Sequence, residues 1–405
     1  MSGVSDAGSI RLLVRRPGVR RTFVLALVGR LTYGMLPLCF LFTARDATGS
    51  FARAAAASAT LGFATLAMPL QSRLVDRFGQ RRVLPLYAGS YIVVLTMTAL
   101  LRDHSLPALW IGLGLLLGLS GPALGPAMRA QWREITAEGD DRRRAYALDS
   151  VGEESLYLIG PLIAGIILAT GRPWLGLLLA VLLIACGTTA LVTSPYRPAV
   201  ERGRSSSAEV ATRVPIRRLL PVLTPLVLFG AGGAATFVGI AALADGIGRP
   251  GLAGVVEAGM ATGAVVGGLV WARFGPATPT SRSLALLLLP LGLVQAAAGG
   301  LADHLAATGV IVAVGALATS PIFIVGFSSA DRLVPARQRT EASTWVSVSV
   351  NAGTACGTAG AGLIAATDGA APFLLAAPLT LCAAVAAGVR GRGGRDGAAR
   401  GWLGR

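Results

Sequence analysis

Long apolar segments constrain this chain more than any other feature of its sequence. Each contains about 20 residues, the length that an α-helix needs to cross the hydrocarbon core of a bilayer. None shows the alternation typical of a strand, so helices rather than a barrel are expected. The twelve segments lie near residues 23–43, 53–71, 83–101, 108–130, 146–169, 173–193, 219–243, 251–272, 284–301, 305–327, 343–366 and 371–389. The sequence therefore predicts an all-α integral membrane protein with twelve transmembrane helices.

Composition and charge agree with a chain that lies mostly in lipid. Hydrophobic residues make up 53% and charged residues only 14%, whereas soluble proteins carry about a quarter charged residues. The net charge of +16 would suit a nucleic-acid partner, but all 36 basic residues are arginine and their distribution is one-sided. Thirty lie in tails and loops on one side of the predicted membrane and five on the other, with Arg30 inside a span. By the positive-inside rule, both termini are expected in the cytoplasm and no nucleic-acid partner is expected.

A polar interval divides the chain into two sets of six segments. Residues 194–218 are rich in Pro, Ser and Arg and are expected to form a cytoplasmic linker. It separates an N-terminal six-helix bundle, residues 23–193, from a C-terminal one, residues 219–389. A cytoplasmic tail, residues 1–22, precedes them, and a basic Gly/Arg-rich tail, residues 390–405, is expected to be disordered.

The two sets of segments are related in sequence. Arg77-Phe78-Gly79 recurs as Arg273-Phe274-Gly275 at an offset of 196, and "GPLIAG" (160–165) aligns with "ACGTAG" (355–360) at an offset of 195. Agreement between two separate places indicates two homologous halves.

The loop between the second and third segments, "SRLVDRFGQRR", carries a patterned charge. Gly79 permits a tight turn, and the arginines hold that turn in the headgroup layer. Asp76 can lie against a helix N-terminus. The alternative is an ordinary charged hairpin that only sets topology. The residues that form the pattern are Ser72, Leu74, Asp76, Arg77, Gly79, Arg81 and Arg82.

This loop resembles the loop 2–3 signature of the major facilitator superfamily. In that signature a small residue, Leu, Asp-Arg, Gly and basic residues follow at fixed spacing. The first position is usually Gly and here is Ser72, and the second-half copy has Ala272 in place of Asp76. The resemblance implies two six-helix bundles, with the loop latching onto the helix that starts near Ala342 in the outward-facing state.

The fifth segment, "YALDSVGEESLYLIGPLIAG" (146–165), brings acids into an apolar helix. At about 100° per residue, Asp149, Glu153 and Tyr157 share one face, Glu154 lies at its edge, and most aliphatic residues take the other side. The acids therefore point into protein or water. Simple pairing with Arg142–Arg144 is the alternative, above all for Asp149.

The end of this segment, "LYLIGPLIAG", resembles the span 5 signature of the superfamily's efflux members. Gly160, Pro161 and Gly165 carry the resemblance. It implies that the segment packs against the other half and that the protein is an exporter. A Gly-Pro kink without directional meaning is the alternative reading.

Arg30 lies within the first span, about eight residues or about 12 Å from the cytoplasmic end. Glu153 lies at the same depth by the same arithmetic. A charge at that depth is costly unless it is paired or hydrated. We therefore predict an Arg30–Glu153 pair facing the central cavity, with Glu154 or Asp149 as alternative partners. Snorkelling of Arg30 to the surface is the competing interpretation.

Glu257 is the second embedded acid, about six residues from the external end of an otherwise uncharged span. A carboxyl in apolar surroundings suits a group that binds and releases a proton, although a solvated rim position is the alternative. Eight further side chains are candidates for the substrate cavity, and each could equally serve packing. They are Tyr33, Tyr157, Phe229, Thr236, Phe323, Phe327, Trp345 and Asn351.

Together these features predict a secondary active transporter in the cell membrane. It would export an amphipathic or drug-like solute by alternating access, as a monomer surrounded by lipid. Its energy source would be a proton gradient, by antiport, and no cofactor is expected. The two histidines lie far apart in external loops and no metal-binding cysteine pattern occurs, so an enzyme is not expected. Without Lys there is no ATP-binding P-loop. A proton-coupled importer of a small metabolite and a non-transporting receptor remain alternatives.

Overall fold

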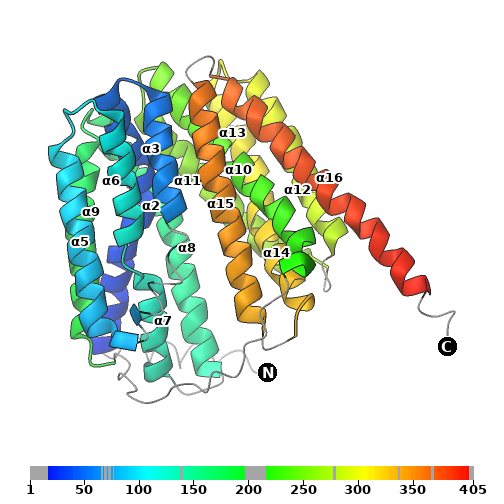
Figure 1. Ribbon diagram of the computed structural model, residues 1–405, viewed down its shortest axis with the longest axis horizontal. Coiled ribbons are helices and arrows are strands. Elements are labelled where there is room, and N and C mark those ends of the chain that lie inside the picture. Colours follow the sequence, from blue (N-terminus) through cyan, green and yellow to red (C-terminus); the bar gives the residue numbers. More distant parts are fainter. Residues whose placement is uncertain are drawn as a thin grey trace.

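The computed structural model is a bundle of helices that run between two ends of the molecule (Figure 1). It describes residues 17–64, 67, 71, 74–75, 77–136, 140–196, 216–276, 280–335, 338–365 and 369–400. Ser72, Asp76, most of the predicted linker and the first 16 residues lie outside this part of the chain. Within it, every regular element is helical, which confirms the predicted all-helical membrane architecture.

The first half contains seven described helices. They are α2 (Pro17–Thr48), α3 (Phe51–Ala64), α5 (Gln80–Leu100), α6 (Pro107–Ser120), α7 (Leu124–Ile135), α8 (Asp140–Ala169) and α9 (Trp174–Thr193). The second half contains α10 (Ile216–Gly246), α11 (Gly251–Phe274), α12 (Ser281–Gly300), α13 (Leu305–Gly315), the 3₁₀ turn η2 (Ala316–Ala318), α14 (Thr319–Arg332), α15 (Arg339–Ala365) and α16 (Ala371–Arg400). The predicted fourth and tenth segments are thus each divided into two helical pieces.

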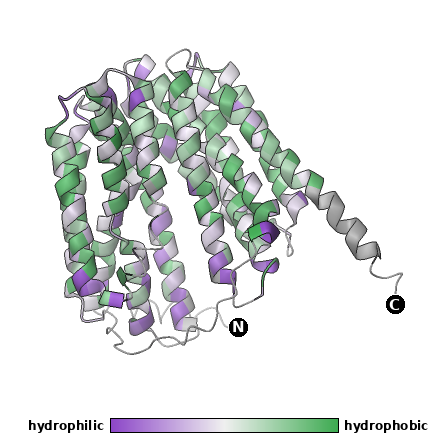
Figure 2. Cartoon of the chain, viewed as in Figure 1, coloured by the Kyte–Doolittle hydropathy of each residue, from purple (hydrophilic) through white to green (hydrophobic). Residues whose placement is uncertain are grey.

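Ten helices among the described residues are long and apolar enough to cross a membrane, counting α6 with α7 and α13 with α14 as single spans. The two other predicted spans are 53–71 and 343–366. The first corresponds to α3, whose described part has only 14 residues, and the second to α15, which is rich in Ser, Thr and Gly. The count of twelve spans therefore stays a prediction. Figure 2 shows hydrophobic residues along the middle of the helices and many hydrophilic residues near the ends drawn at the bottom.

Two helices extend beyond the predicted spans. The helix α2 begins at Pro17, ahead of the span predicted from residue 23, and α16 ends at Arg400, after the span predicted to residue 389. Extending an existing helix avoids the cost of a new nucleus. The predicted disorder of residues 390–405 stays a prediction. Gly79 has a φ of 83° at the start of α5, so the tight turn expected there is present.

The two halves contact each other mainly through α8 with α11 and α3 with α15. We call the end of the bundle where α2 ends and α3 begins the distal end, at the top of Figure 1. Gly165 of α8 packs there on Gly251 and Gly254 of α11, with no room for a Cβ at any of the three. Arg45 Nη2 lies 2.7 Å from Asp245 Oδ2 and links α2 to α10 at the same end. The halves are therefore closed against each other distally.

Candidate functional site

Three helices of the first half gather four charged side chains. Arg30 comes from α2, Arg129 from α7, and Asp149 and Glu153 from successive turns of α8. Residues four apart on a helix share a face, so both carboxylates project in the same direction. Gly34 brings α2 against the backbone of α8, because a Cβ there would collide with the carbonyl of the α8 turn. We call Arg30, Arg129, Asp149 and Glu153 the charge cluster.

Each arginine of the charge cluster contacts both acids. Arg30 Nη1 donates to Asp149 Oδ1 at 2.7 Å and Nη2 donates to Oδ2 at 3.3 Å. The same Nη2 lies 3.0 Å from Glu153 Oε2. Arg129 Nη2 donates to Glu153 Oε2 at 2.6 Å, and its Nε lies 3.4 Å from Asp149 Oδ2. The four formal charges sum to zero, which is the condition for holding them inside an apolar bundle.

Burial separates the charge cluster into an inner and an outer pair. The side chain of Arg30 is 2% exposed and that of Asp149 is fully buried, whereas Glu153 is 29% and Arg129 48% exposed. Arg30 Nε is buried and finds no hydrogen-bond acceptor among the described residues. Arg30 and Asp149, the inner pair, are therefore shielded from solvent. Solvent can reach Glu153 and Arg129, the outer pair.

The break between α6 and α7 shapes the wall of the charge cluster. The hydroxyl of Tyr33 donates to the carbonyl of Pro122, which lies in that break. The new helix then places Gly125 beside the charges, where an added Cβ would lie 3.5 Å from Arg30 Nη2 and 3.6 Å from Glu153 Oε1. Tyr33 therefore supports the site from α2, one turn after Arg30, and its side chain is only partly buried.

Sequence reasoning missed Arg129, which lies at the very end of the predicted span 108–130 and was counted among the thirty arginines of the cytoplasmic side. The structure places this residue on α7, which contacts α2, α8 and α9. The signal that could have found it is the Gly121-Pro122 pair inside the fourth segment, since proline tends to interrupt a helix. Of the predicted partners of Arg30, the structure brings both Glu153 and Asp149 to it, and Asp149 makes the two hydrogen bonds.

Other predicted residues of α8 have different surroundings. Glu154 is exposed, and no ion pair of its side chain is found in the described part of the chain. Tyr157 is 51% exposed. Gly160 packs on Gly34 of the same half, whereas Gly165 packs on α11 of the other half. Within this motif Gly160 therefore contacts α2 of its own half, whereas the carbonyl of Pro161 and Gly165 face α11 of the other half.

The second half places the aromatic candidates in one group. Phe229 of α10 and Phe323 of α14 meet edge to face with ring centroids 5.6 Å apart. Phe327 stacks on Phe323 at 6.3 Å, and Trp345 packs against the same core. Rings in these arrangements gain attraction beyond their buried area, so packing alone accounts for this group as well as solute binding does.

The polar candidates of the second half lie elsewhere. Thr236 is buried on α10 and accepts a hydrogen bond from Gln295 Nε2 at 3.1 Å. Asn351 is partly buried on α15. Glu257 lies on α11, and its Oε1 is buried without a hydrogen-bond partner among the described residues. Glu257 is therefore not part of the charge cluster.

The described residues of the loop between the second and third segments lie just before α5 and in its first turn. Arg77, Arg81 and Arg82 are exposed, and Gly79 makes the turn. The expected latch of Asp76 onto α15 falls outside the described residues.

Comparison with known families decides the class of the protein. The sequence pattern of the Major Facilitator Superfamily matches residues 22–303. The chain belongs to the Major Facilitator Superfamily. This major facilitator is also similar to solved structures. It matches the nucleoside transporter NupG with 14% identity and a TM-score of 0.71 over 91% of this chain and 98% of that chain.

An auto-inhibited POT family peptide transporter matches the same chain with 15% identity and a TM-score of 0.67, over 93% of this chain and 96% of that chain. No curated protein sequence matches this chain. At these identities the structures show the fold alone. Membership of the Major Facilitator Superfamily makes this chain a multi-pass membrane transporter.

Proposed function

We propose that this chain is a secondary active transporter that exports a small amphipathic or drug-like solute from the cytoplasm in exchange for protons. The observation that carries the proposal is the charge cluster. Buried ionisable side chains inside a membrane bundle are costly, and they mark ion or substrate pathways. Here the acid Glu153 is shared by Arg30 and Arg129 and is partly open to solvent. Solvent therefore reaches this acid, and the two hydrogen bonds between Arg30 and Asp149 do not involve it.

Protonation of Glu153 would weaken its hold on both arginines, because a neutral carboxyl loses the ionic attraction. Arg30 keeps Asp149 through two hydrogen bonds, whereas Arg129 keeps only the longer contact of 3.4 Å. Protonation of Glu153 therefore weakens the contact between α7 and α8 more than the contact between α2 and α8. A proton shifts a conformational equilibrium only if it binds one state more tightly, and a differently paired Glu153 supplies that difference.

Direction is inferred from topology and from α8. The arginine distribution assigns the termini to the cytoplasm and hence the distal end to the outside. Because the halves are packed together distally, this arrangement suits binding from the cytoplasmic side. The resemblance of "LYLIGPLIAG" to efflux members supports export. The aromatic group around Phe323, should it face the solute, suits an amphipathic solute better than a sugar or a highly charged metabolite.

The test is uptake of a panel of fluorescent amphiphiles into inverted membrane vesicles with an imposed pH gradient. Gradient-dependent accumulation is expected in the wild-type protein and its loss in Glu153→Gln. Glu134→Gln is the matched control, since Glu134 is an exposed acid on α7 outside the charge cluster. Accumulation that does not depend on the pH gradient would contradict proton coupling. Absence of any flux despite membrane insertion would favour the receptor alternative.

A second candidate is proton-coupled import of a small metabolite. The similar fold of a nucleoside transporter and of peptide transporters favours it. Right-side-out vesicles with the proton gradient directed inward test it with nucleosides and dipeptides. Uptake of one of these solutes, with no accumulation of amphiphiles in inverted vesicles, would show that the protein is an importer and would contradict the export proposal.

A further inference from the structure

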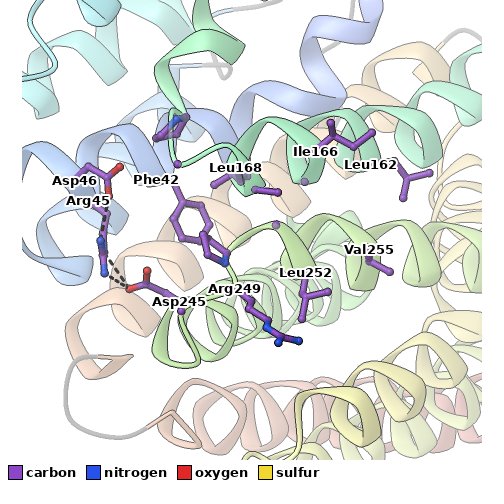
Figure 3. Close-up of a pocket in the computed structure, with 17 residues that line it drawn as sticks. Phe42, Arg45, Asp46, Leu162, Ile166, Leu168, Asp245, Arg249, Leu252 and Val255 are labelled. Carbon is purple, nitrogen blue, oxygen red and sulfur yellow. Dashed lines mark hydrogen bonds and ion pairs between the residues drawn. The ribbon is translucent and has the colours of Figure 1, made fainter.

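A pocket lies between the two halves at the distal end, away from the charge cluster (Figure 3). Its volume is about 900 Å³, which is at the upper end of the range of small-molecule sites. Residues of α2, α8, α10 and α11 line it, together with residues of the turns that follow α8 and α10. Its walls therefore come from both halves of the transporter.

The charges of this pocket are divided into two groups. Arg45 pairs with Asp46 at 3.0 Å and with Asp245 at 2.7 Å, so these three side chains carry one positive and two negative charges. We call them the acidic triad. Arg249 is exposed and forms no ion pair within the described part of the chain. The pocket thus offers a net negative group and a separate free cation.

The remaining walls are aliphatic and exposed. Leu162 and Ile166 follow each other by one turn of α8, and their exposed fractions are 37% and 70%. Leu252 and Val255 do the same on α11, with 36% and 55% exposed. Large apolar side chains that remain exposed on membrane-spanning helices contact lipid chains. The seam between α8 and α11 is therefore a lipid-facing groove.

The order of these groups along the pocket is the order of groups in a phospholipid. In the view of Figure 3 the acidic triad lies at one end, Leu162 and Val255 at the other, and Arg249 in between. Along the chain the same order runs from Asp245 to Arg249 and then into α11.

We propose that this pocket binds a phospholipid whose headgroup carries a primary ammonium beyond its phosphate. The ammonium contacts the acidic triad, the phosphate contacts Arg249, and one acyl chain lies in the groove between α8 and α11. An anionic lipid without an ammonium leaves the net negative triad unmatched. A choline headgroup has the positive charge but no N–H donor for the carboxylates.

The lipid binds the distally closed arrangement, because only that arrangement brings the walls from α8 and α11 together. A ligand that binds one state preferentially stabilises that state. The composition of the outer leaflet therefore controls how readily the distal end opens, whichever solute the transporter carries.

The test is lipid binding to the purified, delipidated full chain in detergent, measured by native mass spectrometry. The probes are phosphatidylethanolamine, phosphatidylcholine and phosphatidylglycerol with identical acyl chains. Wild-type protein should bind phosphatidylethanolamine about five- to tenfold more tightly than either other lipid, a difference of the order of one charge-assisted hydrogen bond. Arg249→Gln should remove most of that affinity, and Arg172→Gln should leave it unchanged. Arg172 is the matched control because it is exposed at the same end and does not line the pocket.

A second variant separates the two headgroup contacts. Asp46→Asn makes the triad neutral, so it should reduce the preference for phosphatidylethanolamine over phosphatidylcholine while phosphate binding to Arg249 persists. Equal affinity of the wild-type protein for all three lipids would overturn the proposal. Equal effects of Arg249→Gln and Arg172→Gln would overturn it as well. Displacement of bound lipid by a transported amphiphile would show instead that the pocket is a solute subsite.

Discussion

The two halves of the transporter use the same packing arrangement around different chemistry. In the first half, Gly34 of α2 presses against the backbone of α8, so the two helices are in close contact. Arg30, one turn earlier on α2, lies beside Gly125 of α7. The space between three helices is thus filled by a charged side chain, whose partners are Asp149 and Glu153.

In the second half the same space is filled by a hydrocarbon side chain. Gly230 of α10 presses against the backbone of α15, and Leu226, one turn earlier, lies close to Gly326 of α14, where an added Cβ would lie 3.0 Å from Leu226 Cδ1. Leu226 is completely buried. The fold therefore does not need charges at this place. Buried ion pairs add little stability over well-packed apolar residues, so their presence in one half points to function.

The largest expected effect comes from breaking the inner pair. Asp149→Leu leaves Arg30 buried with only Glu153 as its partner, and such a loss costs about 3–5 kcal/mol in soluble proteins. We expect a comparable drop in the free energy of unfolding, measured by denaturant titration in mixed micelles. Asp103→Leu serves as the control because the Asp103 side chain is 80% exposed. Equal stability of the two variants would mean that Arg30 finds another partner.

The double variant Arg30→Leu with Asp149→Leu imitates the second half. Its free energy of unfolding should return to within about 1–2 kcal/mol of the wild-type value, because no buried charge remains unpaired. Transport should be absent in this double variant, since Arg129 and Glu153 then remain without the buried charges that they contact in the wild-type protein. Recovery of flux together with stability would show that the inner pair has only a structural role.

The sequence predicted the bundle well because lipid imposes a strong pattern. Only long apolar helices satisfy their backbone hydrogen bonds in a bilayer, so segment lengths alone indicated the architecture. Depth arithmetic also brought Arg30 and Glu153 to one level, and the structure places them 3.0 Å apart. Both predictions rest on properties that follow directly from position along a helix.

What the sequence could not supply depends on contacts between helices. Arg129 was missed because the helix breaks at residues 121–123 and restarts as α7, and the contacts of α7 with α2 and α8 cannot be read from residue spacing. Gly160 packs on Gly34 rather than on the other half, since helix neighbours are set by tertiary packing. Glu154 was an alternative partner of Arg30, and its exposure was decided by the rotation of α8 about its axis.

Glycines also set how closely the two halves approach each other at the distal end. An added Cβ on Gly254 would collide with the carbonyl of Pro161, whereas one on Gly233 would meet nothing within 4 Å. Gly254→Ala should therefore disfavour the distally closed arrangement by about 1–3 kcal/mol, the usual cost of overpacking. Spin labels at the exposed distal positions Thr170 and Asp303 should move apart in this variant and not in Gly233→Ala. Unchanged distances in both would show that this contact does not limit opening.

The smallest expected effect on stability concerns the outer edge of the charge cluster. The Arg129 side chain is 48% exposed, and exposed ion pairs contribute about 0–1 kcal/mol. Arg129→Gln should therefore barely change the free energy of unfolding in the same titration. Transport driven by a pH gradient should nevertheless fall. In the proposed cycle, protonation of Glu153 breaks its ion pair with Arg129, and this variant has no such pair to break. A stability loss as large as that of Asp149→Leu would contradict the division into an inner and an outer pair. If stability and transport are both unchanged, α7 is not the element that responds to the proton, and the contact between α2 and α8 becomes the remaining candidate within the charge cluster.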